Sequence, residues 1–179
     1  HKMAAYDANI RSPMFISYPP VVKGGSVCET PVGGVDLVPT IYGLAGLKPP
    51  WRFHGRDLTP LLRNPSAKWP HPMLLTNSNR SYGSATAKLP PTGIDHPSGI
   101  PWYVLLRQGK WKYVRSLIPG ALEELYDLRA DPAELHNLAA DKAHRKTLRN
   151  LRAAAVAELK RNDAPYADKL PTVKELRND

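Results

Sequence analysis

Two strand-like runs, WYVLLRQ and WKYVRSL, flank the pair Gly109-Lys110 in the second half of the chain. Aromatic and β-branched runs separated by two turn-forming residues are typical of an antiparallel hairpin. A third run, ELYDL at 124–128, can add a strand to the same sheet. The sequence therefore predicts an antiparallel sheet in this half of the chain.

Two helical patterns follow these strands. Asp131, Pro132 and Glu134 match the N-cap, the first helical position and the third position of a capping box, which predicts a short helix at 131–137. Further on, apolar residues recur at helical spacing within 142–161, which predicts a long amphipathic helix. The residues on its apolar face are Leu148, Leu151, Ala155 and Leu159.

The first half of the chain predicts several short elements, in keeping with 19 prolines and 12 glycines in 179 residues. The apolar run MFISY at 14–18 predicts a strand. Asp36 and Gly46 suit the start and the stop of a helix, and the leucines of 58–62 suit one or two further helical turns. The segment NPSAKWPHP at 64–72 has three prolines and is the best candidate boundary. After it, MLLT at 73–76 suits another strand.

Composition narrows the class of protein. Hydrophobic residues make up 42% of the chain, enough for the core of one domain or a small pair. No apolar run approaches the roughly 20 residues that span a bilayer. The net charge of +9 suggests an anionic partner. One dense block of basic residues lies at 107–115, within the predicted hairpin. A nucleic-acid partner is not expected, because neither a stacking platform of aromatic residues nor a reading helix accompanies this block.

Local catalytic motifs are absent from the sequence. It contains no GxSxG, no GxxxxGK[ST], no GxGxxG and no HExxH. The single cysteine, Cys28, rules out an internal disulfide framework and a multi-cysteine zinc site. By residue type alone, Lys2 is a surface lysine that can offer a positive charge to an oxyanion, a sulfuryl group or a phosphoryl group.

The order of several segments carries a resemblance that no single segment does. The succession comprises K-x(3)-YDANIRSP, MFISYPPVVKGGSV, VGGVDLVPTIYGLAGLKPP, HGRDLTPLLRNP, LLRQGKWKYVR and ELYDLRADPAELHNLA. It resembles the C-terminal part of the sulfatase family, whose arylsulfatase-like members belong to the alkaline-phosphatase-like superfamily. The resemblance extends over nearly the whole chain.

The resemblance implies a fold and a division of the chain. Residues 1–70 would be the C-terminal end of the large α/β domain of a longer protein. Residues 71–179 would form a smaller α+β domain, with an antiparallel sheet covered by the long terminal helix. The strand and helices expected before residue 70 are too few to build a parallel sheet alone. We therefore expect this first part to expose apolar surface that upstream strands would cover.

The resemblance also implies an activity and its residues. Sulfatases hydrolyse sulfate esters with a formylglycine beside a divalent cation, commonly calcium, and Lys2 matches a family lysine that contacts the sulfate. His1 is adjacent and has a weaker claim to the same site. Tyr6, Asp7 and Arg11 match the segment that positions this lysine, where packing and an internal Asp-Arg pair would account for them. The implied location is periplasmic, secreted or lysosomal.

The long polar segment after residue 76 is a second candidate site. In this reading it forms part of the substrate pocket and presents Arg80 or His96 to a sulfated small molecule or a sulfated carbohydrate. A histidine that precedes a proline in a loop is better explained by exposure to solvent or by local hydrogen bonding. Both interpretations of His96 stay open at this point.

The chain departs from the family where the nucleophile and the metal are concerned. Cys28 is followed by Glu-Thr-Pro, and no cysteine or serine satisfies C/S-x-P-x-R, so no formylglycine precursor is present. The acidic metal ligands of the family lie in sequence that would precede this region. We therefore expect no metal site in this chain and no activity from it alone. Two alternatives remain: a phosphonate or phosphodiester hydrolase of the same superfamily, and a non-catalytic module that binds a polyanion through the hairpin at 107–115.

Overall fold

The computed structural model describes residues 4–174, which form two compact units. One unit combines the residues up to Arg11 with the chain from Leu74 onward, and the other is Ser12–Met73. The first described residues therefore belong to the same unit as the described chain from Leu74 onward.

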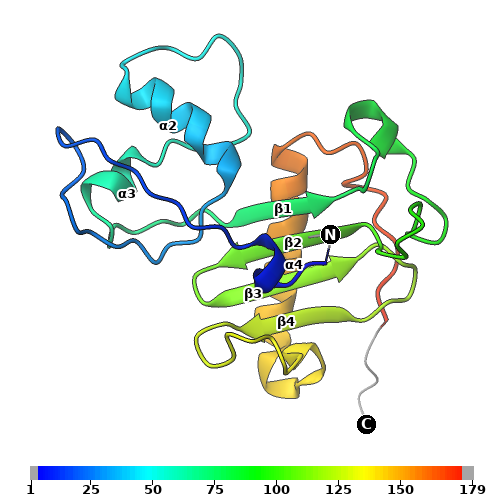
Figure 1. The fold of residues 1–179 in the computed structure, drawn as a ribbon. Helices are drawn as coiled ribbons and strands as arrows, with labels where there is room; N and C mark the ends of the chain where they lie inside the picture. The colour runs from blue at the N-terminus through cyan, green and yellow to red at the C-terminus, as the bar shows by residue number, and fades with distance from the viewer. Residues whose placement is uncertain (1–3, 175–179) are drawn as a thin grey trace. The chain divides into compact units, whose positions relative to one another are not determined.

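The unit that contains the chain from Leu74 onward, which we call the C-terminal unit, is built on an antiparallel sheet, as the sequence predicts. The strands lie in the order β1-β2-β3-β4 (Figure 1). Antiparallel pairing joins β2 to β3 and β3 to β4, with Arg107 opposite Lys112 and Gln108 opposite Trp111. Gly109 occupies the hairpin turn with a φ of 55°, a value that glycine adopts without strain. The strands are Met73–Asn77 (β1), Tyr103–Gln108 (β2), Trp111–Ser116 (β3) and Glu123–Asp127 (β4).

The long C-terminal helix covers one face of this sheet. Helix α4 spans Arg145–Arg161, after the short 3-10 turns Leu138–Ala140 (η3) and Lys142–His144 (η4). Figure 1 shows α4 crossing behind the strands. All four predicted apolar positions of the helix are buried, so the predicted helix and its packing face are confirmed. The core that they share with the sheet includes Trp102, Val104, Leu106, Tyr113 and Leu125.

The opposite face of the sheet is also buried, although it lies outside the helix core. Alternate residues of the strands point to opposite faces, so Leu105, Val114 and Tyr126 point away from α4. Their exposed fractions are 0%, 3% and 5%. The single-turn helix α1, Asp7–Ile10, lies on the viewer's side of the strands in Figure 1.

The second unit contains two short helices, close to where the sequence predicts them. They are α2, Leu37–Leu44, preceded by the 3-10 turn η1, Gly34–Asp36, and α3, Thr59–Arg63. Gly46 follows α2 with a φ of 67°, which confirms it as the stop.

Asp36 ties the start of α2 to a neighbouring loop. Its carboxylate accepts hydrogen bonds from the amide of Gly33 at 2.8 Å and from the amide of Arg56 at 2.7 Å. A Cβ at Gly55 would lie 1.9 Å from the carbonyl oxygen of Val35, so only glycine lets the two backbones approach this closely. Asp36 therefore holds two segments together as well as standing at the start of the helix.

Two predicted elements are wrong. Residues 14–18 form no strand, and Phe15 is 92% exposed. Residues 131–137 form a turn instead of a helix, because the Asp131 carboxylate accepts from the amides of Leu135 and His136 while Glu134 adopts a φ of 58°. The capping-box pattern is present, but its glutamate points elsewhere.

The unit Ser12–Met73 exposes most of its apolar side chains, in agreement with the expectation from the sequence. Among residues 4–174, only two of the nineteen buried hydrophobic residues, Leu58 and Leu61, belong to it. Of the thirteen large hydrophobic residues that are exposed in the same range, nine lie in this unit: Met14, Phe15, Tyr18, Val27, Val35, Val38, Ile41, Leu47 and Trp51. This unit therefore has little apolar core of its own.

Candidate functional site

The residues that follow the predicted sulfate-contacting lysine are attached to the C-terminal sheet through Asp7. Lys2 and His1 lie outside the described residues. Asp7, five positions after Lys2 in the sequence, is the first residue of α1. Its neighbours show how this part of the chain is held.

Asp7 is the centre of a cluster of four charged side chains, which we call the buried ion cluster. One carboxylate oxygen of Asp7 accepts from the Lys112 ammonium at 3.0 Å, and the other accepts from Arg107 Nη1 at 2.8 Å. Lys112 also donates to both carboxylate oxygens of Glu134, at 2.8 and 2.7 Å. The amide of Asp7 donates to Glu134 Oε1 at 2.8 Å. Two cations and two anions thus balance one another.

Burial makes this cluster unusual for charged groups. The side chains of Lys112 and Glu134 are 0% and 2% exposed, and that of Asp7 is 16% exposed. Burial alone would raise the pKa of the Asp7 carboxyl, but hydrogen bonds and charge from Lys112 and Arg107 outweigh it and hold the pKa below the ordinary value of 3.8. The Asp7 carboxylate is therefore ionised at neutral pH.

Glu134 reaches the cluster at a cost in backbone conformation. Its φ of 58° lies in the left-handed region, which residues other than glycine, asparagine and aspartate adopt rarely. The turn that Asp131 organises places Glu134 there, with the residue 7% exposed overall. The glutamate read from the sequence as part of a capping box is instead a ligand of Lys112.

The expected pairing within the N-terminal segment is wrong. Asp7 takes its arginine from β2, as Arg107, and not from Arg11 in its own segment. The alternation of side chains along the strands indicates that Arg107 and Lys112 need carboxylate partners, which the spacing of the motifs does not show. Arg107 and Lys112 face each other across the hairpin, on the same side of the sheet as the apolar Leu105 and Val114. Cations on a buried face require carboxylate partners.

The hairpin does not present the patch of free cations that a polyanion-binding module needs. Arg107 and Lys112 belong to the buried ion cluster. Lys110 donates to Asp127 at 2.5 Å and lies 4.7 Å from the ring centre of Trp111, and Arg115 donates to the carbonyl of Pro171. Every hairpin cation that the sequence singled out has a partner inside the protein. The polyanion-binding alternative stays a prediction to which Lys112, at 0% exposure, cannot contribute.

The second predicted site lies in the connection from β1 to β2, and hydrogen bonds join the two ends of this connection. The side-chain amide of Asn79 donates to Asp95 Oδ1 at 2.8 Å and to the backbone carbonyl of Ile100 at 3.2 Å. The Ser81 hydroxyl donates to Asp95 Oδ2 at 3.4 Å. These bonds join the turn that contains Arg80 to the segment that contains His96.

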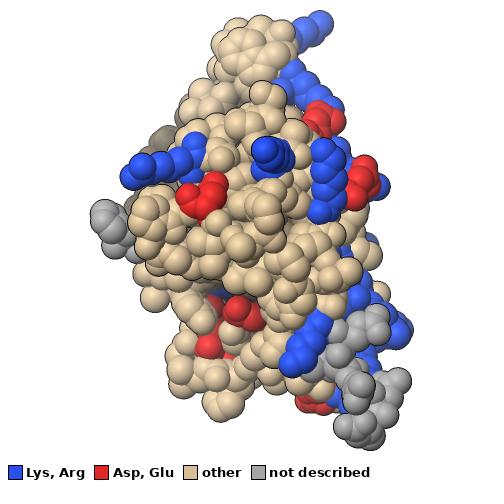
Figure 2. All heavy atoms as spheres, turned by 90° about the vertical axis from the view of Figure 1, so that its right-hand side faces the viewer, with Lys and Arg blue, Asp and Glu red and all other residues tan. Residues whose placement is uncertain are grey.

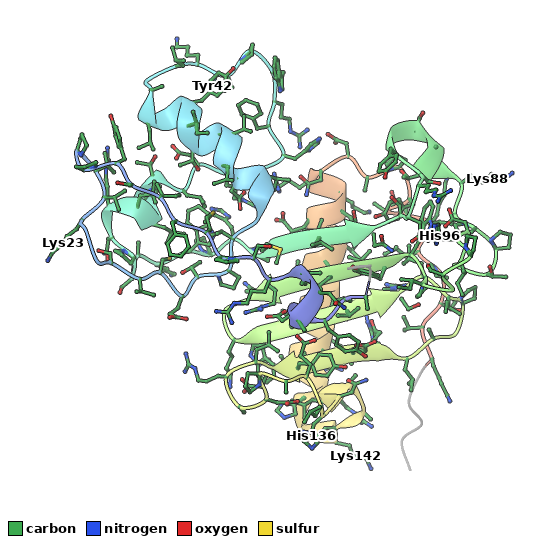
Figure 3. All side chains as sticks on the ribbon, in the orientation of Figure 1. Lys23, Tyr42, Lys88, His96, His136 and Lys142 are labelled. Atoms are coloured by element: carbon green, nitrogen blue, oxygen red, sulfur yellow. The ribbon has the colours of Figure 1, made fainter. Side chains whose placement is uncertain are left out.

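Arg80 is exposed and His96 is half-buried, at the end of the sheet opposite the Gly109 turn. The Nδ1 atom of His96 lies 2.8 Å from the Ser98 hydroxyl, and Figure 3 shows the ring among the connecting loops. Partial burial would raise the pKa of the nearby Asp95 carboxyl, but hydrogen bonds from Asn79 and Ser81 lower it. The connection therefore carries one fixed carboxylate between two candidate anion-binding side chains.

Charge on this side of the molecule is dispersed. Figure 2 shows separate lysine and arginine side chains with apolar and neutral surface between them, and acidic groups interspersed. A surface of this kind suits a small anion held by one or two side chains better than a long polyanion.

The described residues hold no group of three or more histidine, cysteine, aspartate and glutamate side chains able to bind a metal ion. Cys28 is exposed, with its thiol 3.5 Å from the carbonyl of Pro65. No described helix is long and apolar enough to cross a membrane.

An open hollow of about 280 Å³ lies within the unit Ser12–Met73. Apolar side chains such as Phe15, Val27 and Leu62 line it, and its lining includes no acidic, basic or histidine side chain.

The sequence of this chain is similar to that of known proteins. The family described as "N-sulphoglucosamine sulphohydrolase, C-terminal" matches residues 1–77. Choline-sulfatase of Rhizobium meliloti is 31% identical over 163 residues, which cover 86% of this chain and 27% of the relative. The chain thus spans about a quarter of the length of this curated relative.

Two solved structures share the fold. One, solved in complex with its substrate D-glucosamine-2-N,6-O-disulfate, superposes with a TM-score of 0.63 at 23% identity, over 83% of this chain and 28% of that one. The phosphonate monoester hydrolase of Silicibacter pomeroyi superposes with a TM-score of 0.56 at 26% identity, over 82% of this chain and 29% of that one.

Proposed function

This chain belongs to the sulfatase family and matches its C-terminal part, and from that premise we propose that it completes an enzyme that hydrolyses sulfate esters. The observation that carries the proposal is the family match over residues 1–77, which includes the segment of Lys2 and Asp7. The activity, substrate and partners of the whole protein are part of the proposal.

In the proposed enzyme, Lys2 contacts the sulfate. A lysine ammonium is a compact positive charge, and it favours a transition state in which negative charge grows on the sulfuryl oxygens and the leaving oxygen. The buried ion cluster supports this assignment, because it attaches Asp7, five positions after Lys2, to the C-terminal sheet. His1 is proposed as a weaker contact on the side of the leaving group.

The nucleophile and the metal belong to the preceding part of the proposed enzyme. A formylglycine would supply the nucleophile and a calcium ion or another divalent cation would supply charge stabilisation. The described residues do not offer a metal site, and the sequence has no C/S-x-P-x-R. We therefore expect no sulfate-ester turnover from the 179-residue chain alone.

Arg80 and His96 are proposed to contact the substrate. Their segments are joined through Asn79 and Asp95, and Arg80 is exposed while His96 is half-buried. The relative that acts on a sulfated small molecule supports a substrate of that class, with a sulfated carbohydrate as the other possibility. The proposed compartment is periplasmic, secreted or lysosomal.

A phosphonate ester hydrolase is the second candidate. It is favoured by the fold shared with the Silicibacter pomeroyi enzyme at 26% identity. Both reactions place negative charge beside a cationic side chain, so Lys2 would serve either one.

The test uses the full-length protein with 4-nitrophenyl sulfate and a phenyl phosphonate monoester. The sulfate ester is expected to react with the larger kcat/KM. Lys2→Ala is expected to lower kcat/KM by about 100-fold or more, the range found when one donor to a developing anion is removed. Lys23→Ala is the matched control, because Lys23 is exposed in a turn of the other unit (Figure 3). Unchanged kinetics in Lys2→Ala would contradict the assignment, and a preference for the phosphonate ester would favour the second candidate.

A further inference from the structure

We propose that Lys112 and Glu134 are positioning residues for Lys2: they hold Asp7, five positions later in the sequence, against the C-terminal sheet. This inference rests on the proposed contact between Lys2 and the sulfate. It assigns a catalytic consequence to side chains that lie more than a hundred positions away in the sequence and that touch no substrate.

The attachment restrains Asp7 in more than one direction. Arg107 from β2 and Lys112 from β3 hold different oxygens of the Asp7 carboxylate. Glu134 holds the backbone amide of the same residue at 2.8 Å. A side chain held at two oxygens and a backbone held at its amide cannot rotate or slide without breaking a charge-assisted hydrogen bond.

Glu134 joins the two sets of contacts. It accepts from Lys112 with both oxygens and from Asp7 with one of them, so the lysine and the backbone of α1 share one carboxylate. The chain brings this carboxylate into place with a left-handed φ of 58° at a residue other than glycine. Such conformations persist where the surrounding contacts hold them, and they are enriched at functional sites.

Packing alone does not require such a cluster. Removing charges from water is costly, and apolar residues of similar size can often replace a buried ion pair without loss of stability. What the ions add is direction, because each hydrogen bond fixes the position of a particular atom. A lysine that must meet a transition state benefits from that direction, since a misplacement of about 1 Å can cost about 100-fold in rate.

The test is a double-mutant cycle in the full-length protein, with 4-nitrophenyl sulfate as the substrate. Asp7→Asn keeps the shape of the side chain and removes its charge. It is expected to lower kcat/KM by about tenfold to 100-fold, chiefly through kcat, because the displaced group acts in the transition state. In a Lys2→Ala background the same substitution is expected to cause no further loss.

Glu134→Gln is the second variant, because it retains an oxygen that can accept from the Asp7 amide and from Lys112. It is expected to follow the same pattern in the cycle, and it keeps the test open if Asp7→Asn fails to fold. Arg152→Met is the matched control. Arg152 pairs with the buried Glu123 in the same unit but does not touch α1. It is expected to lower thermal stability and leave kcat unchanged at temperatures where the protein stays folded.

The outcomes separate the inference from the function on which it rests. A loss that is equal in the Lys2 and Lys2→Ala backgrounds, or an equal loss of kcat in Arg152→Met, would overturn the positioning role. Hydrolysis that falls in Lys2→Ala but not in Asp7→Asn or Glu134→Gln would overturn it as well, and would leave the proposed function standing. No hydrolysis of the sulfate ester by the unsubstituted protein would overturn the proposed function itself.

Discussion

At the scale of single residues, Gly55 is the position least able to accept a side chain. A Cβ there would lie 1.9 Å from the carbonyl oxygen of Val35 and 2.8 Å from the amide nitrogen of Asp36. Both atoms belong to backbone, so relief requires movement of the segment that begins α2. The loop would then separate from the Asp36 carboxylate that its Arg56 amide now reaches.

Gly55→Ala is therefore expected to lower the free energy of unfolding by about 1–3 kcal/mol, the usual cost of inserting atoms into a filled space. Denaturant titration of the chain would measure it. Gly24→Ala is the control, since a Cβ at Gly24 meets nothing within 4 Å. Equal stability of the two variants would contradict the steric argument.

The Asp7 carboxyl predicts a dependence of stability on pH. Its pKa is lower in the folded protein than the ordinary 3.8, so the folded state binds the proton less readily than the unfolded state does. The stabilisation is fully present above the unfolded pKa and is lost as the pH falls through the folded pKa. We expect the free energy of unfolding to decrease as the pH drops below about 4.

Unfolding titrations in acetate and citrate buffers would measure this loss. Asp7→Asn has no proton to bind at that position, so its stability should depend less steeply on pH in the same window. Parallel slopes for the unsubstituted chain and the variant would show that the acid sensitivity arises elsewhere. Asp127 and Asp131, whose pKa values are also lowered, are the next candidates.

The residue types alone predicted less of the buried ion cluster than the alternation of side chains along the strands could have predicted. The sequence marked Lys112 as one of a block of surface cations, whereas its side chain is 0% exposed. Strand alternation places it on one face with Leu105 and Val114, which is sufficient to expect burial. Its partners Asp7 and Glu134 could not be found in this way, because they are 105 and 22 positions distant and lie outside the strands.

At the scale of elements, α4 depends on a single apolar stripe. Leu151 is 4% exposed within the core that the helix shares with the sheet. Leu151→Ala is expected to lower the free energy of unfolding by about 2–5 kcal/mol, from lost burial and the cavity left behind. Arg149→Ala, at an exposed position of the same helix, should change stability by no more than about 0.5 kcal/mol. Thermal unfolding of both variants would measure the difference, and equal effects would contradict the assigned helix face.

The elements that the sequence predicted correctly are those whose pattern agrees with their tertiary setting. The hairpin and the third strand pair with each other, and α4 packs its apolar face against them. The helix predicted at 131–137 fails because the Asp131 carboxylate binds the amides of a turn and Glu134 binds Lys112, so a long-range ion pair outweighs a local capping preference. The strand predicted at 14–18 fails because an apolar run pairs only where a neighbouring strand is available.

At the scale of the whole molecule, the two units differ in how much apolar surface they bury. Local stability follows buried apolar contacts, so backbone amides of Ser12–Met73 should open more readily than those of β2 and β3. Hydrogen–deuterium exchange of the 179-residue chain is expected to show early exchange across Ser12–Met73 and late exchange across the central strands. Equal protection of the two units would contradict this expectation.

The bond from the Asp7 amide to Glu134 spans 127 positions of the chain. During synthesis α1 leaves the ribosome before the partner of its Asp7 amide has been made. At typical elongation rates the wait is on the order of ten seconds. A chaperone or an arrest of translation before residue 134 would therefore act on a chain in which α1 is made but not yet fully anchored.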